Sequence, residues 1–357
     1  MLEVQKVLRN NQNPLEFLKS NYGVEHKFND TKDLVILDYD QIECEKLKQK
    51  KSSVVRECRG LVLDPLNDWR IVSKAFNRFF SLDEYPDDFN WGRTITCSAK
   101  HDGSLIKISN YMGKLLITTR FSFGEGEVNK SGFTWRDLVL AHVDPSKLNP
   151  NLTYVCELCG PYNRIVRDYP PTLYLLSAFY HEIDDSVWEV PLDVVQTESI
   201  VSGIPLTEHY QVSSKEDVVS LLERLGKEHS DFEGVVLNDG NQRVKVKREQ
   251  YLLLHRMISN HQITDADLLD MAFTGESSEF LSYFKDYIPR YESIINKFEK
   301  LKIEIQNTYD KYKEIVNQKD FAIQAMKYKY YFALFELRKG KSVQEILSNA
   351  EKIVNLF

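Results

Sequence analysis

Three strand-like runs and one polar pentapeptide make up residues 94–119, which read TITCSAKHDGSLIKISNYMGKLLITT. The runs at 104–109 and 114–119 are rich in aliphatic residues and flank a turn, which predicts a β-hairpin. The run at 94–99 leads into the pentapeptide Lys100-His101-Asp102-Gly103-Ser104. A lysine, an acid, a glycine and a hydroxyl between strands suit a covalent-catalysis site, but a Lys-x-Asp-Gly run is also an ordinary polar turn.

Lys100 would need activation before it could act as a nucleophile. A lysine amine attacks phosphorus only when deprotonated, and at an unperturbed pKa of about 10.4 only on the order of one molecule in a few thousand is ready at neutral pH. Gly103 would let the backbone come close to a ligand, while Asp102 and Ser104 offer polar contacts beside the amine. The pentapeptide therefore requires partners from elsewhere in the chain.

The composition indicates a globular protein with room for two domains. The chain has 357 residues, of which 28% are charged and 42% hydrophobic. It has no apolar run of membrane-spanning length and no signal-peptide pattern at its start, so we expect a cytoplasmic protein without a membrane partner. Five cysteines without disulfide spacing suit a reducing compartment. A net charge of −7 disfavours a general nucleic-acid coating protein but allows a local basic cleft.

Strand patterns dominate the first 250 residues. Besides those in 94–119, apolar β-like runs occur at 34–39, 60–64, 70–73, 152–157 and 172–179. A second hairpin is expected from 232–237 and 243–247, which flank the turn Asn238-Asp239-Gly240-Asn241. We therefore expect a β-rich α+β domain over residues 1–250.

Two helices are predicted within this domain. One covers residues 14–19. The other begins at a capping box formed by Ser213 and Glu216, and Gly226 is expected to end it.

Helical spacing replaces the strand pattern after about Gln250. Apolar residues recur at intervals of three and four at Ile294, Phe298, Leu301, Ile305, Tyr309, Tyr312 and Val316. No proline follows Pro289; Gly340 is expected to end one helix, and Ser342 with Glu345 to cap a final one. We infer an all-helical C-terminal domain over residues 251–357.

Two basic clusters beside predicted strands could bind phosphate. Arg56 and Arg59 present the paired donors that suit phosphate, or they could be surface residues that pair with Glu57 and Asp64. The segment 74–80 alternates basic and aromatic residues, which could pack near a base or could be core phenylalanines with solvated neighbours.

Two carboxylates and two lysines complete the candidate site. Glu157 lies within an apolar strand, where an acid costs stability unless it finds a partner such as a ribose hydroxyl or a metal-bound water. Glu233 opens the second hairpin, and Lys245 and Lys247 sit two apart on its return strand, so they point to one face. Such a pair favours an anion such as a triphosphate, and its field is expected to lower the pKa of Lys100.

In order and spacing these clusters resemble the motifs of the covalent nucleotidyltransferases, the superfamily of ligases and capping enzymes, and most closely the phage-type RNA ligase 1 family. Lys100-x-Asp102-Gly103 matches motif I, Glu157 motif III, Glu233-Gly234 motif IV and Lys245-x-Lys247 motif V. Matches run from about Tyr39 to Tyr251 and include 56–60, the Phe79-Phe80 pair and 163–166. DNA ligases and capping enzymes usually carry arginine where Ser104 stands, and they continue into an OB-type β-barrel rather than helices.

The resemblance implies a fold and an activity. The fold is α+β, with a nucleotidyltransferase domain of ATP-grasp-like antiparallel sheets followed by the helical domain as an RNA-specificity module. The activity is ATP-dependent joining of RNA 5′-phosphate and 3′-hydroxyl ends, with tRNA among the candidate substrates, ATP and Mg²⁺ (or Mn²⁺) as cofactors, and a monomeric protein. The alternatives are a DNA ligase, a GTP-dependent capping transferase, and an RNA-end-binding protein without catalysis.

The resemblance also assigns roles to single residues. Lys100 takes the AMP, while Lys245 and Lys247 bind the α-phosphate and its leaving group. The implied nucleotide-binding set is Tyr39, Arg56, Arg78, Asp102, Gly103, Arg120, Glu157, Glu233, Lys245 and Lys247, in which the three arginines hold the outer phosphates, Glu157 contacts ribose, and Glu233 contacts a metal-bound water or the lysine. Two positions depart from the family pattern, because Arg78 replaces a lysine and Phe121 replaces the glycine after Arg120.

Four other patterns suit structural roles better than chemical ones. Segment 124–131 lacks the P-loop glycine before its lysine and carries two acids, and Cys156 and Cys159 form a lone Cys-x-x-Cys without a second pair. His101 would point away from Lys100 in an extended segment. Segment 327–331 mixes cations with rings that could stack on bases, but on a helix several of these residues belong to the core.

Overall fold

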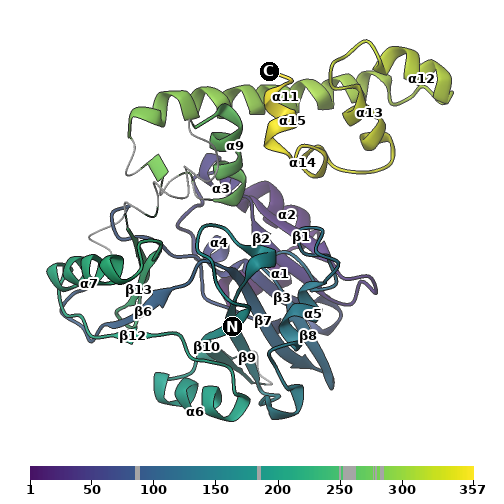
Figure 1. Cartoon of the computed structure of the whole chain (residues 1–357). Coiled ribbons are helices and arrows are strands. Elements are labelled where there is room, and N and C mark those ends of the chain that lie inside the picture. Colours follow the sequence, from purple (N-terminus) through teal and green to yellow (C-terminus); the bar gives the residue numbers. More distant parts are fainter. Residues whose placement is uncertain are drawn as a thin grey trace. The chain divides into compact units, whose positions relative to one another are not determined.

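The chain divides into an N-terminal unit, Met1–His255, and a C-terminal unit, Arg256–Phe357. The computed structural model describes residues 1–84, 89–182, 186–248, 251, 263–275, 277, 280–281 and 285–357 (Figure 1). Gln250, where helical spacing was expected to begin, lies outside the described residues. None of the described helices is long and apolar enough to cross a membrane.

The first sheet is antiparallel, in the order β1-β2-β3-β4. Its strands cover Val24–Phe28, Val35–Tyr39, Arg59–Asp64 and Arg70–Ser73. Helices α1 (Glu3–Arg9), α2 (Pro14–Tyr22), α3 (Gln41–Lys46) and α4 (Ser53–Glu57) belong to the same segment. Leu8, Leu18 and Val55 from three of these helices pack with Leu37 and Leu61 of the sheet in one core.

The second sheet has the order β11-β10-β9-β7-β8, and all of its pairs are antiparallel. The strands are β7 (Ser104–Tyr111), β8 (Lys114–Thr118), β9 (Leu152–Cys159), β10 (Thr172–His181) and β11 (Val187–Glu189). One face packs with α5 (Trp135–Leu140) and α6 (Leu192–Ser202), through residues such as Ile106 and Cys156. Because side chains alternate along a strand, Lys107 and Glu157 lie on the opposite face.

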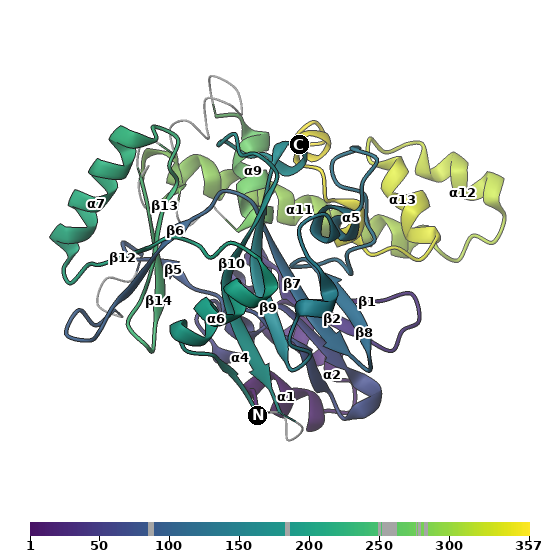
Figure 2. The ribbon, with the colours of Figure 1, turned by 60° about the horizontal axis from the view of Figure 1, so that its bottom comes forward.

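The third sheet carries the predicted motif I lysine, in the order β12-β6-β13-β14-β5. Its strands are β5 (Phe80–Ser81), β6 (Thr96–Lys100), β12 (His209–Tyr210), β13 (Gly234–Asn238) and β14 (Arg243–Lys247). Helix α7 (Lys215–Glu228) lies against one face, where its leucines meet Ala99, Val235 and Leu237 (Figure 2). Lys100 and Lys247 therefore lie on the face away from α7.

Both predicted hairpins are confirmed, as β7–β8 and β13–β14. The strands that the sequence pattern missed are β1, β5, β11 and β12, each of which is an edge strand.

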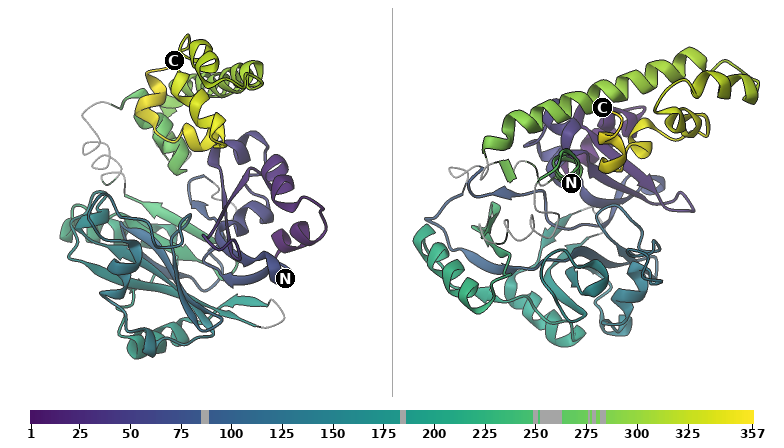
Figure 3. Two further views of the ribbon diagram at one scale, coloured as in Figure 1. Left: turned by 90° about the vertical axis from the view of Figure 1, so that its right-hand side faces the viewer. Right: turned by 45° about the horizontal axis from the view of Figure 1, so that its top comes forward.

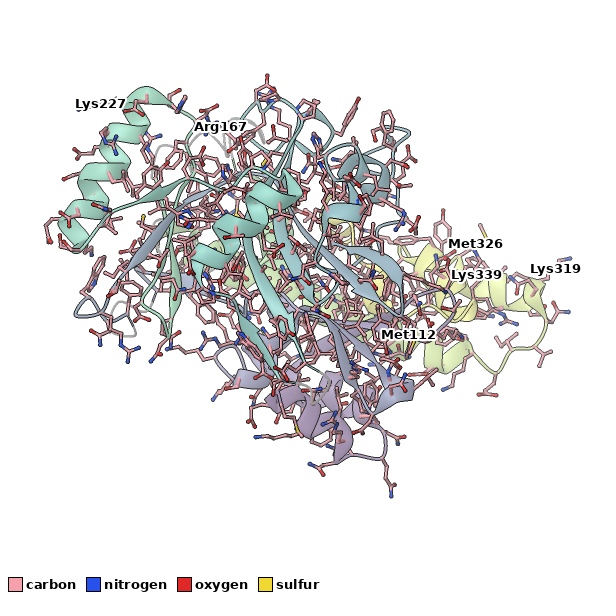
Figure 4. The ribbon with its side chains drawn as sticks, turned by 90° about the horizontal axis from the view of Figure 1, so that it is seen from below. Met112, Arg167, Lys227, Lys319, Met326 and Lys339 are labelled. Carbon is pink, nitrogen blue, oxygen red and sulfur yellow. The ribbon has the colours of Figure 1, made fainter. Side chains whose placement is uncertain are left out.

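The side chains of Met112, at the turn of the β7–β8 hairpin, and Lys227, on α7, are exposed (Figure 4).

Two details predicted for α7 are wrong. The N-cap is Ser214 with Asp217 as its capping-box partner, one residue later than expected, and the Asp217 carboxylate also accepts from the Ser213 hydroxyl. Gly226 lies inside the helix rather than ending it. A Cβ atom at Gly226 would lie 2.2 Å from Arg248 Nη2, so the glycine makes room for that arginine.

The described part of the C-terminal unit is helical (Figure 3). Its helices are α9 (Asp265–Thr274), α11 (Ile288–Tyr312), α12 (Gln318–Ala325), α13 (Tyr331–Arg338), α14 (Val343–Ile346) and α15 (Ala350–Val354). The predicted stripe on α11 is confirmed at Ile294, Phe298, Leu301 and Ile305, which are all buried, whereas Val316 lies beyond the helix and is 92% exposed. Ser342 and Glu345 do form a capping box, on α14 rather than on the last helix.

Candidate active site

Strand register brings Lys100 and Lys247 together although they are far apart in sequence. Gly234 of β13 pairs with Lys100 of β6 on one side and with Lys247 of β14 on the other. On the next rung of the same face, Val236 pairs with Lys245. Because Gly234 has no side chain, nothing from the central strand stands between the two lysines.

Glu233 joins these lysines. Its Oε1 atom lies 2.6 Å from Lys100 Nζ and 3.2 Å from Lys247 Nζ. The glutamate is 3% exposed and the Lys100 side chain is 24% exposed, so the acid is buried while the lysine remains partly accessible. Glu233 Oε2 is buried and has no hydrogen-bond partner within the described structure.

Glu157 lies on β9, where it pairs with Leu105 of β7 and Tyr174 of β10. Burial raises the pKa of this carboxyl to about 7; the charge of Lys100 opposes the shift and that of Glu233 adds to it. Glu157, Lys100 and Glu233 therefore act on one another electrostatically, as expected for members of one site.

Asp102 is buried and bonds to the protein's own backbone. It is 3% exposed, and its Oδ2 accepts the backbone N–H groups of Val166 at 2.8 Å and Arg167 at 2.9 Å. The acid thereby fixes the 163–167 loop, which contains the stretch 163–166 singled out from the sequence, against the loop that follows Lys100. The same loop is held at Asn163, whose amide donates to Ser104 Oγ at 3.0 Å and to Leu158 O at 2.6 Å.

Gly103 is required by close packing of the protein on itself. A Cβ atom there would lie 2.3 Å from Leu158 O and 2.7 Å from Cys159 Sγ. The sequence led us to expect that a ligand comes close to this backbone. In the structure, strand β9 comes close to it and accounts for the glycine. His101 points elsewhere, as expected: its ring stacks on Tyr174 at 3.8 Å and its Nε2 lies 3.2 Å from Glu208.

Tyr39, Arg78 and Arg120 form a second group. The guanidinium carbons of Arg78 and Arg120 lie 4.4 Å and 4.5 Å from the centroid of the Tyr39 ring. Arg120 Nε also pairs with Asp38 at 2.8 Å, and this charge raises the pKa of the arginine. Arg78 is 4% exposed, so it serves at least in part to hold the cluster together.

Arg56 lies next to this group. Its Nε donates to Arg78 O at 3.0 Å, and its Nη2 donates to Gln242 Oε1 at 3.0 Å. The alternative partner Glu57 accepts instead from the backbone of Val4 at 2.9 Å.

Two further cations, Lys107 and Arg59, lie outside the predicted nucleotide-binding set. Sequence reasoning assigned no role to the buried Lys107, whereas it placed Arg59 beside Arg56 as a candidate phosphate donor. Lys107 is 0% exposed, its amine donates to Gly60 O, and burial lowers its pKa to about 7. Arg59 lies with its guanidinium 5.3 Å from the Phe79 ring, and its Nη1 is buried without a described partner. The lysine inside the apolar run Leu105–Ile108 was the signal that could have revealed the first of them.

The Cys-x-x-Cys pair is structural. Cys156 and Cys159 are buried free thiols, and burial raises the pKa of both. No group of three or more metal-ligating side chains occurs among the described residues.

Comparison with known proteins gives a family match and two distant relatives. Residues 57–252 match the family model described as RNA ligase. The chain is 26% identical over 335 residues to a protein of Autographa californica nuclear polyhedrosis virus named as a bifunctional polynucleotide kinase/RNA ligase, covering 87% of this chain and 44% of that protein. It is 24% identical over 238 residues to a protein of Thermovibrio ammonificans named as an RNA ligase, covering 64% and 60%. The chain thus spans less than two thirds of either relative.

Solved structures give the fold. An archaeal ATP-dependent RNA ligase aligns with a TM-score of 0.51 at 14% identity, over 82% of this chain and 77% of that one. A protein named as an ATP-dependent DNA ligase, from Aquifex aeolicus, aligns with a TM-score of 0.50 at 15% identity, over 92% and 87%. At these identities the likeness shows a ligase-type fold and leaves the substrate open. Since the family match covers more than half of the chain and includes Lys100, Glu157 and Glu233, the resemblance seen in the motifs is confirmed, and the chain belongs to the RNA ligase family.

Proposed function

We propose that this protein is an ATP-dependent RNA ligase that joins 5′-phosphate and 3′-hydroxyl ends through lysyl-AMP and RNA-adenylate intermediates. The observation that carries the proposal is the group formed by Lys100, Glu233 and Lys247. It combines a partly exposed amine with a buried acid at 2.6 Å and a second cation at 3.2 Å from the same oxygen. An amine with an acid in contact and cations beside it is what nucleophilic attack on a phosphate requires.

In the first step the Lys100 ammonium gives up a proton, and Glu233 is the acceptor in contact with it. The amine lone pair then forms the N–P bond to the α-phosphate of ATP, and the bond from that phosphorus to the β-phosphate oxygen breaks, so pyrophosphate leaves with the electron pair. Lys245 and Lys247, on the same face as Lys100, stabilise the negative charge that develops on the phosphates. The AMP then passes to an RNA 5′-phosphate, and an RNA 3′-hydroxyl displaces it.

The other predicted residues support this chemistry in different ways. Glu157 contacts the ribose, and Arg56, Arg78 and Arg120, gathered around Tyr39, hold the outer phosphates. Asp102 and Gly103 act by positioning, because one fixes the 163–167 loop and the other permits contact with β9.

One acid of the site fits a divalent ion such as Mg²⁺ or Mn²⁺. Magnesium usually binds through one or two carboxylates and completes its shell with phosphate oxygens and water, so no large ligand cluster is needed. Glu233, whose Oε2 lacks a partner within the described structure, would hold it. Such an ion would supply positive charge beside the phosphates.

The helical C-terminal unit is proposed as the part that selects the RNA, and broken tRNA is among the candidate substrates. The protein is proposed to be a monomer.

One experiment tests the activity: incubate the protein with Mg²⁺, ATP or GTP, and nicked or single-stranded 5′-phosphorylated RNA or DNA, and follow sealing on a gel. Sealing of RNA with ATP supports the proposal. Sealing of DNA alone, use of GTP alone, or RNA binding without any sealing would contradict it in favour of a DNA ligase, a capping transferase or a non-catalytic protein.

A further inference from the structure

A cavity of about 280 Å³ lies within the N-terminal unit, near the turn of the β13–β14 hairpin. Three basic side chains line it: Lys74, Arg243 and Arg56, the last of which the proposed function also assigns to the outer phosphates of ATP. Glu189 is the single carboxylate among the lining residues that the structure describes. The cavity therefore carries an excess of two positive charges, which favours an anionic occupant.

The charged groups of the cavity are held in place. Arg243 pairs with Glu189 through two bonds, of 2.7 Å and 3.1 Å. Lys74 is 6% exposed, and its amine donates to Ala75 O at 2.8 Å and to Asn77 Oδ1 at 2.7 Å. Each guanidinium or ammonium has more donors than these bonds use, so a phosphate can be accepted without breaking them.

Aromatic rings form part of the wall, at Phe76, Phe79, Phe179 and Trp188, and three asparagines, which carry side-chain amides, also line it: Asn77, Asn238 and Asn241. Arg243 lies 4.1 Å from the centroid of the Phe76 ring, and Trp188 at the rim is 44% exposed and stacks on Tyr180 at 5.0 Å. An inorganic anion gains nothing from contact with aromatic rings, whereas an unstacked nucleic-acid base can stack on them. Cations for a phosphate, rings for a base and amide groups for its edge are the means by which proteins bind single-stranded RNA.

One of the lining residues, Arg243, lies on the sheet face that also bears Lys100. Arg243 follows the same face of β14 as Lys245 and Lys247, since the three alternate with core residues. Arg243 and Lys247 are four positions apart on the strand, which corresponds to about 13 Å. The basic row thus leads from the nucleophile to the cavity.

We propose that this cavity binds one nucleotide of the RNA strand that is being sealed, with its phosphate at Arg243 and Lys74 and its base among the rings. The inference rests on the proposed function. The cavity is small, at about 280 Å³, so we assign it one nucleotide rather than a longer segment.

The test measures RNA binding separately from the reaction of Lys100 with ATP. Binding of a short 5′-phosphorylated oligoribonucleotide to the intact chain is measured without ATP, and fluorescence anisotropy gives its Kd over a range of NaCl concentrations. The variants are Arg243→Gln, Arg243→Lys and Trp188→Ala. Arg224→Gln, on α7 with a side chain 61% exposed, and Phe17→Ala, on α2, are the matched controls. Circular dichroism melting verifies that each variant folds.

Three results are expected. Arg243→Gln weakens binding and reduces the slope of log Kd against log salt by about 0.7, the value for one phosphate contact on a single strand, while Arg243→Lys keeps the slope. Trp188→Ala raises Kd about tenfold without changing the slope. Lysyl-AMP formation by Arg243→Gln stays within about twofold of the unmodified protein.

Unchanged Kd and slope in both Arg243→Gln and Trp188→Ala would overturn the inference. So would a parallel loss of lysyl-AMP formation, or an equal weakening of ATP binding, because the cavity would then hold the free nucleotide. If the unmodified protein forms no lysyl-AMP at all, the proposed function fails, and the binding measurements still decide whether the cavity holds RNA.

Discussion

Replacing Lys107 with methionine should stabilise the N-terminal unit, and the gain should shrink as the pH rises. Burial lowers the pKa of this lysine from 10.5 to about 7, so near neutrality the unfolded chain binds a proton that the folded chain holds only in part. From these two values the lysine costs on the order of 4 kcal/mol at pH 7 and about 2 kcal/mol at pH 9. Methionine cannot donate to Gly60 O, and the loss of this hydrogen bond costs about 1–3 kcal/mol. The variant should therefore show a modest net increase in the free energy of unfolding at pH 7.

The direction of the pH dependence follows from the same shift. Between pH 7 and 10.5 the unfolded state binds more protons, so the free energy of unfolding of the unmodified protein rises with pH, whereas the methionine variant lacks this contribution. The difference between the two proteins should therefore fall by about 2 kcal/mol from pH 7 to pH 9.

Urea unfolding measures this difference in the intact chain. All four tryptophans, Trp69, Trp91, Trp135 and Trp188, lie in the N-terminal unit, so their fluorescence reports on that unit alone. Lys114→Met, an exposed lysine on the neighbouring strand β8, is the control and should change stability by less than about 0.5 kcal/mol at either pH. A difference between Lys107→Met and the unmodified protein that stays constant from pH 7 to pH 9 would refute the assignment of a neutralised buried amine.

Three further predictions concern the active site. Glu233→Gln should slow labelling by α-labelled ATP about a hundredfold or more, because Lys100 loses the acid in contact with it; a rate near that of the unmodified protein would remove Glu233 from the mechanism. The rate of lysyl-AMP formation should rise through about pH 7 as Glu157 ionises, and Glu157→Gln should lose this limb of the profile; an identical profile in both proteins would be the contrary result. Gly103→Ala should cost about 1–3 kcal/mol because its Cβ would meet a carbonyl oxygen of β9 at 2.3 Å, and melting should show this against Gly126→Ala, where the nearest atom is 3.6 Å away.

The long strands of the fold could be predicted from the sequence because they show either alternating apolar and polar residues or a continuous apolar run. The four strands that were missed are edge strands, and β5 and β12 are two residues long, too short to show a period. The one-residue error at α7 has a local cause, since Ser213 and Ser214 are adjacent and both bond to Asp217.

The sequence motifs predicted which residues come together in the site, and the strand register of the third sheet explains how they do so. The pairing of Gly234 with Lys247 belongs to the predicted hairpin, but its pairing with Lys100 joins strands more than a hundred residues apart, which no local pattern encodes. For the same reason the sequence could not show that Asp102 bonds to the backbone of Val166 or that Lys107 reaches Gly60 O, because both contacts join distant segments.

Labelling of Lys100 tests the central claim most directly. The protein is incubated with Mg²⁺ and α-labelled ATP, and the labelled product is treated with acid. We predict an acid-labile adduct on the unmodified protein and on Lys114→Ala, and none on Lys100→Ala. No label on the unmodified protein, or an undiminished label on Lys100→Ala, would contradict the assignment of Lys100 as the nucleophile.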